Sequence, residues 1–291
     1  MSIFKNQLFK TFGFIWFHPL NRGGRIRAVM RLFRWQFSSR LLYEAEFILP
    51  FINGTKLIVR RGMTGATGNW YSRLHEPDEM LFVLHFLRNE DLFGDIGANI
   101  GSYTVLAAGV AGCRVESFEP IPVTFDYLKR NIAINNLTEN VGLHCLGLSD
   151  KVGELIFTDS LDTVNHIVSD NNVGLNVRVD RLDAFFVDNC PALIKIDVEG
   201  FEVPVLNGAK SILNDNRLKA VIVETNGSGN RYGFTDTDIF DILSKYGFVP
   251  CHYDGIQNKL STYKEGQLNT IFVKDIHYVK SRLEASKFNI Q

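Results

Sequence analysis

From about Leu92 onward, the sequence alternates short β-rich runs with amphipathic stretches of helical length. This alternation is typical of βαβ units around a largely parallel sheet. We therefore predict an α/β fold with a doubly wound, mostly parallel seven-stranded sheet and helices on both faces. Helices are expected over about 122–135 and 202–214, and residues 151–180 are expected to form extended strands or loops that shape a substrate mouth. The expected strands cover residues 91–95, 114–119, 142–148, 193–198, 220–224, 248–252 and 270–273.

The first expected strand runs into the sequence GDIGANIG at residues 94–101, whose glycines indicate a tight turn beside a ligand. A dinucleotide fingerprint starting at Gly97 would need glycines where the chain has Asn99 and Ser102. A phosphate-binding loop would need a lysine where Tyr103 stands. What remains is D-x-G-x-N-x-G, in which asparagine readily accepts a left-handed backbone. Because Asp95 would repel phosphate, the turn favours a cationic or hydroxyl-bearing ligand, such as a sulfonium with an amino-acid tail.

Glu119 follows the second expected strand in the sequence RVESFEP. Doubly wound folds place an acidic residue about twenty positions after the first glycine, where it accepts hydrogen bonds from ribose hydroxyls. A glycine turn and a ribose-binding acid in this order indicate a nucleoside ligand without phosphates. S-adenosylmethionine fits this description, and we predict it as the cofactor.

Over about residues 75–275, the chain resembles class I S-adenosylmethionine-dependent methyltransferases of the FkbM type, through DIGANIGSYT, FEP, LSD, LIKIDVEGFEVPVLNGA and VIVET. The most specific segment is IKIDVEGFE at residues 194–202. Two positions depart from the general class I pattern: Gly94 stands where such strands usually carry an aliphatic residue, and Asn99 replaces the middle glycine of the turn. The resemblance implies a Rossmann-like fold and a set of cofactor-binding residues. Asp95, Gly97, Ala98, Asn99 and Gly101 would hold the methionine end, Glu119 and Pro120 the ribose, and Ser149 and Asp150 the adenine, and Asp197 would also contact the cofactor.

The fourth core strand delivers acidic residues to the same edge of the sheet. Methyl transfer to oxygen is an in-line displacement at an activated sulfonium, so an enzyme must align the acceptor and remove one proton. Asp197 ends the apolar run ALIKI, and Glu199 and Glu202 follow it at the carboxyl edge, where α/β sheets bind ligands. We interpret Asp197 and Glu199 as catalytic residues and Glu202 as a carboxylate that stabilises the start of a helix.

Other side chains near this edge leave alternatives open. Three histidines are candidate bases: His75, His166 and His252. Of these, His75 in RLHEPDEM is the third catalytic candidate, because its segment could fold over the cofactor. Oxygen ligands for Mg²⁺ could come from Asp197, Glu224 and Asn226, but no spacing requires a metal, and we do not favour this alternative. Lys195 lies within a strand that should be buried, so we interpret it as structural and expect either an acidic partner or an outlet to solvent.

The N-terminal segment has a charge pattern of its own. Residues 1–43 contain eight of the 31 Lys/Arg residues and no acid, which leaves 23 basic residues against all 32 acidic residues in the remainder. Helical spacing places Ile26, Met30, Phe33 and Phe37 on one face, and Arg27, Arg31 and Arg34 on an adjacent face. This basic amphipathic helix could lie on an anionic membrane surface, bind a lipid-linked or acidic glycan, dock another subunit, or pack on the core with solvated arginines.

Composition narrows the class of protein and its surroundings. A formal net charge of −1 offers no bulk attraction for nucleic acid, which we do not expect as a partner. Four widely spaced cysteines without a C-x-x-C pair indicate a reduced, cytoplasmic protein rather than a disulfide or zinc scaffold. We expect a basic N-terminal extension over residues 1–50, the methyltransferase domain over 51–275 and a C-terminal tail over 276–291.

We predict an O-methyltransferase that acts on a hydroxyl of a sugar or glycan, such as a surface polysaccharide or a lipid-linked oligosaccharide. The resemblance includes the N-terminal pattern HPLNRG…W, which accompanies FkbM-type enzymes of surface polysaccharide pathways. This pattern favours a glycan acceptor that is methylated near the cytoplasmic face of the membrane. One alternative is O-methylation of a small natural product such as a polyketide. Another is a non-catalytic scaffold in a glycan assembly complex, against which the acids at Asp95, Glu119 and Asp197 argue.

Overall fold

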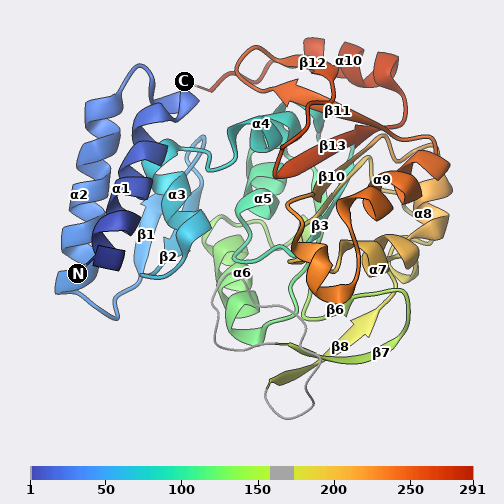
Figure 1. Ribbon diagram of the computed structural model, residues 1–291, viewed down its shortest axis with the longest axis horizontal. Helices are drawn as coiled ribbons and strands as arrows, with labels where there is room; N and C mark the ends of the chain where they lie inside the picture. The colour runs from blue at the N-terminus through green and yellow to red at the C-terminus, as the bar shows by residue number, and fades with distance from the viewer. Residues whose placement is uncertain (1, 158–173, 291) are drawn as a thin grey trace.

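The structure, a computed structural model, describes residues 2–157 and 174–290 (Figure 1). An eight-stranded sheet crosses its centre. Five parallel strands form one side of this sheet, and three antiparallel strands continue it. In spatial order the strands are β12 (Lys259–Thr262), β11 (Val249–Asp254), β13 (Asn269–Val273), β10 (Ala220–Glu224), β9 (Leu193–Ile196), β3 (Leu92–Ile96), β4 (Arg114–Phe118) and β5 (Val141–His144). The predicted doubly wound, mostly parallel sheet is confirmed, and β12 is an edge strand that the sequence pattern did not predict.

The register of the central strands brings several predicted site residues to one edge. Asp95 of β3 pairs with Lys195 of β9 on one side and with Ser117 of β4 on the other. Because these strands are parallel, the residues that follow them leave the sheet at the same edge. The glycine turn, Glu119 and Asp197 therefore meet at this carboxyl edge.

Helices cover both faces of the sheet through two separate apolar clusters. One cluster joins the sheet to α4 (Pro77–Phe86), α6 (Pro122–Ile134), α10 (Ile276–Glu284), and α5 (Ser102–Val105) with its π-helical continuation η2 (Leu106–Ala111). The other cluster joins it to α7 (Glu202–Asn207), α8 (Lys210–Asn214) and α9 (Asp236–Lys245). Short 3₁₀ turns form η1 (Pro19–Asn21), η4 (Leu182–Ala184) and η5 (Ser228–Tyr232).

Two predicted elements are each divided in the structure. The expected strand 142–148 becomes β5 in the central sheet and β6 (Gly147–Leu148) in a second, three-stranded sheet. The expected helix 202–214 becomes α7, which ends at the cap residue Gly208, and α8, which begins after the cap residue Ala209. The backbone at Gly208 lies so close to Ser149 that a Cβ atom on Gly208 would be 2.0 Å from the Ser149 carbonyl oxygen.

The second sheet has the order β6, β8 (Leu175–Asp180), β7 (Gly153–Phe157). It confirms the expected extended structure in the described parts of 151–180. His166, one of the candidate bases, lies outside the described residues.

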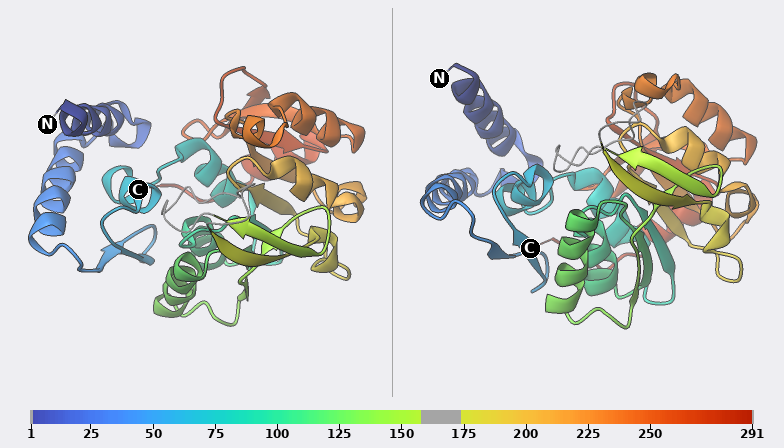
Figure 2. Two further views of the ribbon diagram at one scale, coloured as in Figure 1. Left: turned by 60° about the horizontal axis from the view of Figure 1, so that its bottom comes forward. Right: turned by 90° about the horizontal axis from the view of Figure 1, so that it is seen from below.

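The N-terminal segment forms α1 (Ser2–Phe17), α2 (Arg25–Leu41) and a hairpin of β1 (Phe47–Pro50) and β2 (Lys56–Val59), followed by α3 (Thr64–Ser72). Both views in Figure 2 place α1 and α2 at one end of the molecule. The expected boundary at residue 50 falls inside the hairpin, and the division into three segments stays a prediction. Within residues 2–157 and 174–290, no helix combines the length and apolarity needed to cross a bilayer.

The face of α2 that packs against the protein is not the predicted apolar face. Its buried residues are Ala28, Leu32, Trp35 and Ser39, whereas Ile26, Met30, Phe33 and Phe37 are exposed. Arg31 also departs from the predicted arginine face, because its guanidinium lies over the Trp70 ring of α3, 5.9 Å from the centroid. The helix therefore packs on the core, but it keeps a second, apolar face in water.

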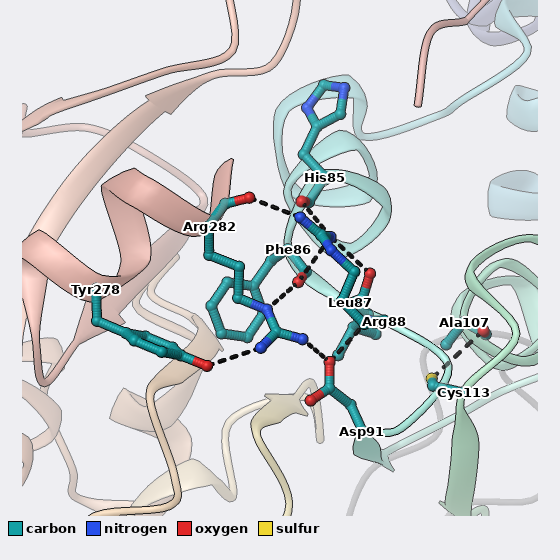
Figure 3. Close-up of polar contacts among 9 residues, drawn as sticks. All are labelled: His85, Phe86, Leu87, Arg88, Asp91, Ala107, Cys113, Tyr278 and Arg282. Atoms are coloured by element: carbon teal, nitrogen blue, oxygen red, sulfur yellow. Dashed lines mark hydrogen bonds and ion pairs between the residues drawn. The ribbon is translucent and has the colours of Figure 1, made fainter. Parts of the chain in front are cut away.

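At the other end of the chain, α10 packs beside α4 through a cluster of charged side chains (Figure 3). Arg282 donates to the Phe86 carbonyl (2.6 Å) and the Tyr278 hydroxyl (2.7 Å) and forms an ion pair with Asp91. Arg88 donates to three carbonyls at the end of α4 and to the Arg282 carbonyl (2.7 Å). Through these contacts, the carbonyl groups at the end of α4 accept hydrogen bonds that the helix itself cannot supply. The same contacts attach the C-terminal segment to the start of β3.

Candidate active site

The glycine turn has the backbone that its sequence predicts. Gly97, Asn99 and Gly101 have φ values of 77°, 51° and 91°, all in the left-handed region. The amides of Gly97 and Ala98 donate to the Phe118 carbonyl at 3.0 and 2.9 Å, which ties the turn to β4. A Cβ atom on Gly97 would lie 1.8 Å from the Asp197 carbonyl oxygen, so this position accepts only glycine without rearrangement.

Asp95, just before the turn, is buried and only half satisfied. Its Oδ2 accepts a 2.6 Å hydrogen bond from Thr104 Oγ1, while Oδ1 is buried and has no partner among the described residues. Burial raises the pKa of Asp95, and the charge of Lys195 opposes this shift. An acceptor atom left without a donor at this place suits a ligand that carries a donor or a positive charge.

Glu119 lies buried beyond β4 and holds the turn. Its two carboxylate oxygens accept from the amides of Asn99 (3.0 Å) and Ile121 (2.9 Å). Each oxygen can accept a second hydrogen bond, so both remain able to bind ribose hydroxyls. Burial raises the pKa of Glu119 to about 7.

A small cavity of about 100 Å³ lies between the turn and the second sheet, and its lining combines apolar side chains such as Phe118 and Phe157 with the Glu119 carboxyl group. Pro120 and Glu119 line one part of it, and their contact with a ribose stays a prediction. The predicted adenine residues are placed differently: Ser149 is buried, Asp150 is exposed, and the cavity lining there consists of Leu146, Gly147, Leu148 and Phe157. An adenine contact from Ser149 or Asp150 stays a prediction.

A second cavity, of about 300 Å³, contains the predicted catalytic residues and will be called the acidic cavity. Asp197 and Glu199 line both this cavity and the small one, so they stand between the two. Carboxylates dominate its polar lining, and the cation among them is Lys195. The acidic residues that line it are Glu76, Asp95, Asp197, Glu199 and Glu224.

Lys195 holds Asp197 in place. Its ammonium donates to Asp197 Oδ2 at 2.6 Å and lies 4.6 Å from the centre of the Tyr103 ring. Burial would lower the pKa of Lys195, but the carboxylates of Asp197, Glu76 and Asp95 together raise it above its ordinary value. Lys195 thus has an acidic partner, which the sequence analysis gave as one of two alternatives.

The neighbouring carboxyl groups have pKa values far above those of exposed acids. Burial raises the pKa of Glu199 to about 7 and that of Glu224 to about 9, and in both cases the charge of Asp197 adds to the shift. Glu199 also has a positive φ of 55°, which is rare for a residue with a side chain. A strained, half-buried carboxyl group with a near-neutral pKa is typical of a functional site.

Two other polar residues at this edge of the sheet, Glu202 and Asn226, accept hydrogen bonds from nearby backbone amides. Glu202 begins α7 and accepts from the amides of Val198 and Gly200 at 3.1 Å each, which agrees with its predicted place at a helix start. Asn226, in the metal alternative, accepts instead from the Ser228 amide at 2.8 Å. Within the described ranges, no group of three His, Cys, Asp or Glu side chains has the arrangement of a metal site. The alternative with Mg²⁺ gains no support from these contacts.

His75 lines the acidic cavity, but His252 does not. The His75 amide donates to Asn69 Oδ1 (2.7 Å), and its buried ring nitrogen Nδ1 has no partner among the described residues. Burial lowers the pKa of His75, with the charge of Glu76 opposing, so the ring is neutral near pH 7. His252 hydrogen-bonds with Gln267 (2.6 Å) in the antiparallel part of the sheet.

The sequence analysis missed the acidic residue beside His75. Glu76 accepts from the Tyr103 hydroxyl (2.7 Å) and from the Asn269 amide group (3.0 Å), so it joins α4, α5 and β13 around the acidic cavity. Asn69 of α3 joins this network by donating to Ser102 at 3.2 Å. The Glu-Pro pair that starts α4 was the available signal, although it indicates a helix start as readily as a site.

A third cavity, of about 520 Å³, lies between the N-terminal helices and α3 and will be called the outer cavity. It shares Thr64 and His75 with the acidic cavity, so the two are neighbours. Its lining combines aromatic rings, basic groups and hydroxyls, which include Trp35, Tyr71, Lys10, Arg61, Ser39 and Thr67.

The sequence comparison decides the family. The family model described as "Methyltransferase FkbM domain" matches residues 95–250, which is more than half of the chain and contains the turn, Glu119 and the fourth-strand acids. The chain belongs to the FkbM methyltransferase family. The predicted resemblance is confirmed, and the reaction class is methyl transfer.

Individual proteins that resemble this chain share less than a third of their aligned residues with it. The chain is 29% identical over 175 residues to the hexuronic acid methyltransferase AglP of Haloferax volcanii, covering 58% of this chain and 68% of that protein. It is 27% identical over 168 residues to the methyltransferase sdnD of Sordaria araneosa, covering 45% of this chain and 64% of that one. A crystal structure of methyltransferase FkbM from Methylobacillus flagellatus aligns with 16% identity and a TM-score of 0.45, over 72% of this chain and 52% of that one.

The site fits S-adenosylmethionine, the cofactor predicted for this family. Asp95 offers an unpaired carboxylate oxygen, Gly97 leaves room where a side chain would collide, and Glu119 keeps acceptor capacity for a ribose. The acidic cavity has an excess of negative charge next to the turn, which suits a ligand with a sulfonium and an ammonium group. The assignment of individual contacts remains a proposal.

Proposed function

We propose that this methyltransferase transfers a methyl group from S-adenosylmethionine to a hydroxyl of a sugar or glycan. The observation that carries this proposal is the acidic cavity, where Asp197, Glu199 and His75 lie beside the glycine turn. When bound, the cofactor supplies an electrophilic methyl group. The name of AglP, a hexuronic acid methyltransferase, supports a sugar acceptor.

The residues at the cavity have different tasks in this proposal. Lys195 fixes the Asp197 carboxylate, so Asp197 orients the acceptor hydroxyl through its remaining oxygen. Glu199 accepts the hydroxyl proton, because a base with a pKa of about 7 is half deprotonated at neutral pH and still basic enough to act. His75, which lines the same cavity and whose ring is neutral near pH 7, is the alternative base that would take the proton in place of Glu199.

The outer cavity supports an acceptor larger than one sugar. The accessible part of its lining includes the half-buried Phe14 ring, which packs on the apolar face of a sugar ring in this proposal, and Gln36 and Thr64, which hydrogen-bond sugar hydroxyls. Lys10 and Arg61 complement an acidic group such as a uronate. A glycan with its reacting hydroxyl in the acidic cavity and its next sugars in the outer cavity would use both.

The experiment that tests this proposal follows methyl transfer to a panel of acceptors. The purified chain is incubated with S-adenosylmethionine and with uronate-containing oligosaccharides, neutral oligosaccharides or small phenolic alcohols. We expect the uronate-containing oligosaccharides to gain one methyl group on a hydroxyl oxygen, detected by mass spectrometry and located by NMR. Methylation of the phenolic alcohols in preference to any saccharide would favour the small-molecule alternative and contradict the sugar acceptor.

Exchange of the two proposed catalytic acids gives a sharper test. Glu199→Gln should lower kcat by about 10²–10⁴, the loss typical of a positioned base. Asp197→Asn should also lower kcat and, because this residue lines both cavities, weaken cofactor binding. Glu202→Gln is not a suitable control, because Glu202 accepts hydrogen bonds from the amides of Val198 and Gly200, on either side of Glu199. The control is Glu139→Gln, at an exposed position that lines neither the small cavity nor the acidic cavity, and it should leave kcat unchanged. Full activity of folded Glu199→Gln would move the role of base to His75.

A further inference from the structure

Helix α2 carries a row of large apolar side chains that points into water. Ile26, Met30, Phe33, Phe37 and Leu41 are each between 52% and 73% exposed. Their spacing of three or four residues places them on one side of the helix. We call this row the apolar stripe. Large apolar groups exposed singly are ordinary, but a continuous row of five on one helix marks an interaction surface.

The stripe is not needed for folding, because α2 already packs through its opposite side. Ala28, Leu32, Trp35 and Ser39 are buried, and the Trp35 ring meets Phe47 edge to face at 5.3 Å. At 100° per residue, these four positions lie about 180° from the stripe. Figure 2 places α1 and α2 at one end of the molecule, so the stripe belongs to an outer surface.

Arginines flank the stripe. Arg27 follows Ile26 and Arg34 follows Phe33, so both lie along one border of the stripe, and both are exposed. Arg25 and Arg31 are turned to the protein instead: Arg25 donates to the Trp16 carbonyl at 3.0 Å, and Arg31 lies over Trp70. Residues 1–43 contain no acidic residue that would neutralise this border.

We propose that the apolar stripe and its arginine border dock the protein on an anionic lipid surface, with α2 lying in the plane of the interface. An apolar face bordered by cations matches a bilayer, whose acyl chains take the apolar side chains and whose anionic headgroups take the arginines. A second copy of the chain would bring Arg27 and Arg34 of two molecules together, which like-charge repulsion disfavours. This proposal stands independently of the methyl acceptor.

Vesicle binding by the full chain tests the proposal. Flotation is measured with vesicles of phosphatidylcholine and with vesicles of equal parts phosphatidylcholine and phosphatidylglycerol, at low and high salt. We expect the wild type to bind the anionic vesicles and salt to weaken this binding. Phe33→Ser with Phe37→Ser, and separately Arg27→Glu with Arg34→Glu, should each weaken it at least about tenfold.

Matched controls separate the stripe from general surface effects. Val187→Ser with Leu268→Ser removes two side chains that are 75% and 70% exposed elsewhere, and Lys210→Glu with Lys245→Glu reverses two exposed charges elsewhere. Both control variants should bind vesicles like the wild type. Unaltered circular dichroism and cofactor binding establish that the variants are folded.

Three outcomes would overturn the proposal. The first is equal vesicle binding by wild type and both stripe variants, and the second is no binding of wild type to anionic vesicles. The third is a concentration-dependent dimer in analytical ultracentrifugation that Phe33→Ser with Phe37→Ser abolishes, which would assign the stripe to a second copy. None of these measurements uses a methyl acceptor, so failure here is distinguishable from failure of the proposed function.

Discussion

At the residue scale, the site depends on contact between two segments that are a hundred residues apart in the sequence. Gly97 of the turn lies against the Asp197 carbonyl, and Asp197 in turn donates its amide to the Ile96 carbonyl at 3.0 Å. The backbone beyond Asp197 is itself unusual, with positive φ at Glu199 and Gly200. The glycine motif and the fourth-strand motif therefore form one structure, in which a change at either affects both cavities.

Gly97→Ala tests this contact. The added Cβ would lie 1.8 Å from the Asp197 carbonyl oxygen and φ is 77°, so the turn or the Asp197 loop must shift. We expect calorimetric affinity for S-adenosylmethionine to fall at least about tenfold. The control is Gly153→Ala, because a Cβ atom there meets nothing within 4 Å. Equal affinity of the two folded variants would mean that the turn does not hold the cofactor.

At the element scale, the sequence predicted the elements with strong periodicity and missed those that depend on tertiary contacts. The helix at 122–135 and the strand at 220–224 appear almost unchanged as α6 and β10. The edge strand β12 has the sequence KLST and half-exposed residues, so it has no apolar run to recognise. The same contrast holds for site residues. Asp95 and Asp197 belong to recognisable sequence motifs and were predicted. Glu76 was missed, because its position at the site depends on how α4 packs on the sheet.

The attachment of α10 to α4 gives a prediction for stability. In Arg282→Ala, the Asp91 carboxylate and the Phe86 carbonyl lose a mostly buried cation, whose side chain is 14% exposed. We expect the free energy of unfolding in urea to fall by about 3 kcal/mol, as when one partner of a buried ion pair is removed. Arg217→Ala breaks the exposed pair with Asp215 and should leave the free energy of unfolding nearly unchanged. Similar losses in both variants would contradict a structural role for the cluster in Figure 3.

At the scale of the whole molecule, charge is unevenly distributed along the chain. The N-terminal helices carry cations and no acid, whereas the remainder has more acidic than basic residues and concentrates five carboxyl groups around the acidic cavity. The basic end suits an anionic surface, and the acidic cavity suits a cationic ligand. Because the cavity's carboxyl groups are partly or fully buried and close to one another, several of them bind protons near neutral pH when no cation neutralises them.

This proton binding predicts how cofactor affinity depends on pH. The pKa of Glu199 is raised to about 7 and that of Glu224 to about 9, so the ligand-free acidic cavity is partly protonated at neutral pH. A cation stabilises the deprotonated carboxylates, so binding of S-adenosylmethionine should release protons, and linkage then requires affinity to rise with pH. We expect an increase on the order of tenfold between about pH 5.5 and 7.5, a window below the titration of the ligand's amino group.

S-adenosylhomocysteine is the matched control for this experiment, because it keeps the amino group and the nucleoside but lacks the sulfonium charge. Calorimetry in buffers of different ionisation enthalpy counts the protons released by each ligand, and S-adenosylmethionine should release more. Glu224→Gln should reduce the difference between the two ligands, because it removes one of the titrating groups that line the acidic cavity. An affinity for S-adenosylmethionine that is constant or falls over this pH range would mean that the raised carboxyl groups do not face the sulfonium, and that the cavity's negative charge serves the acceptor instead.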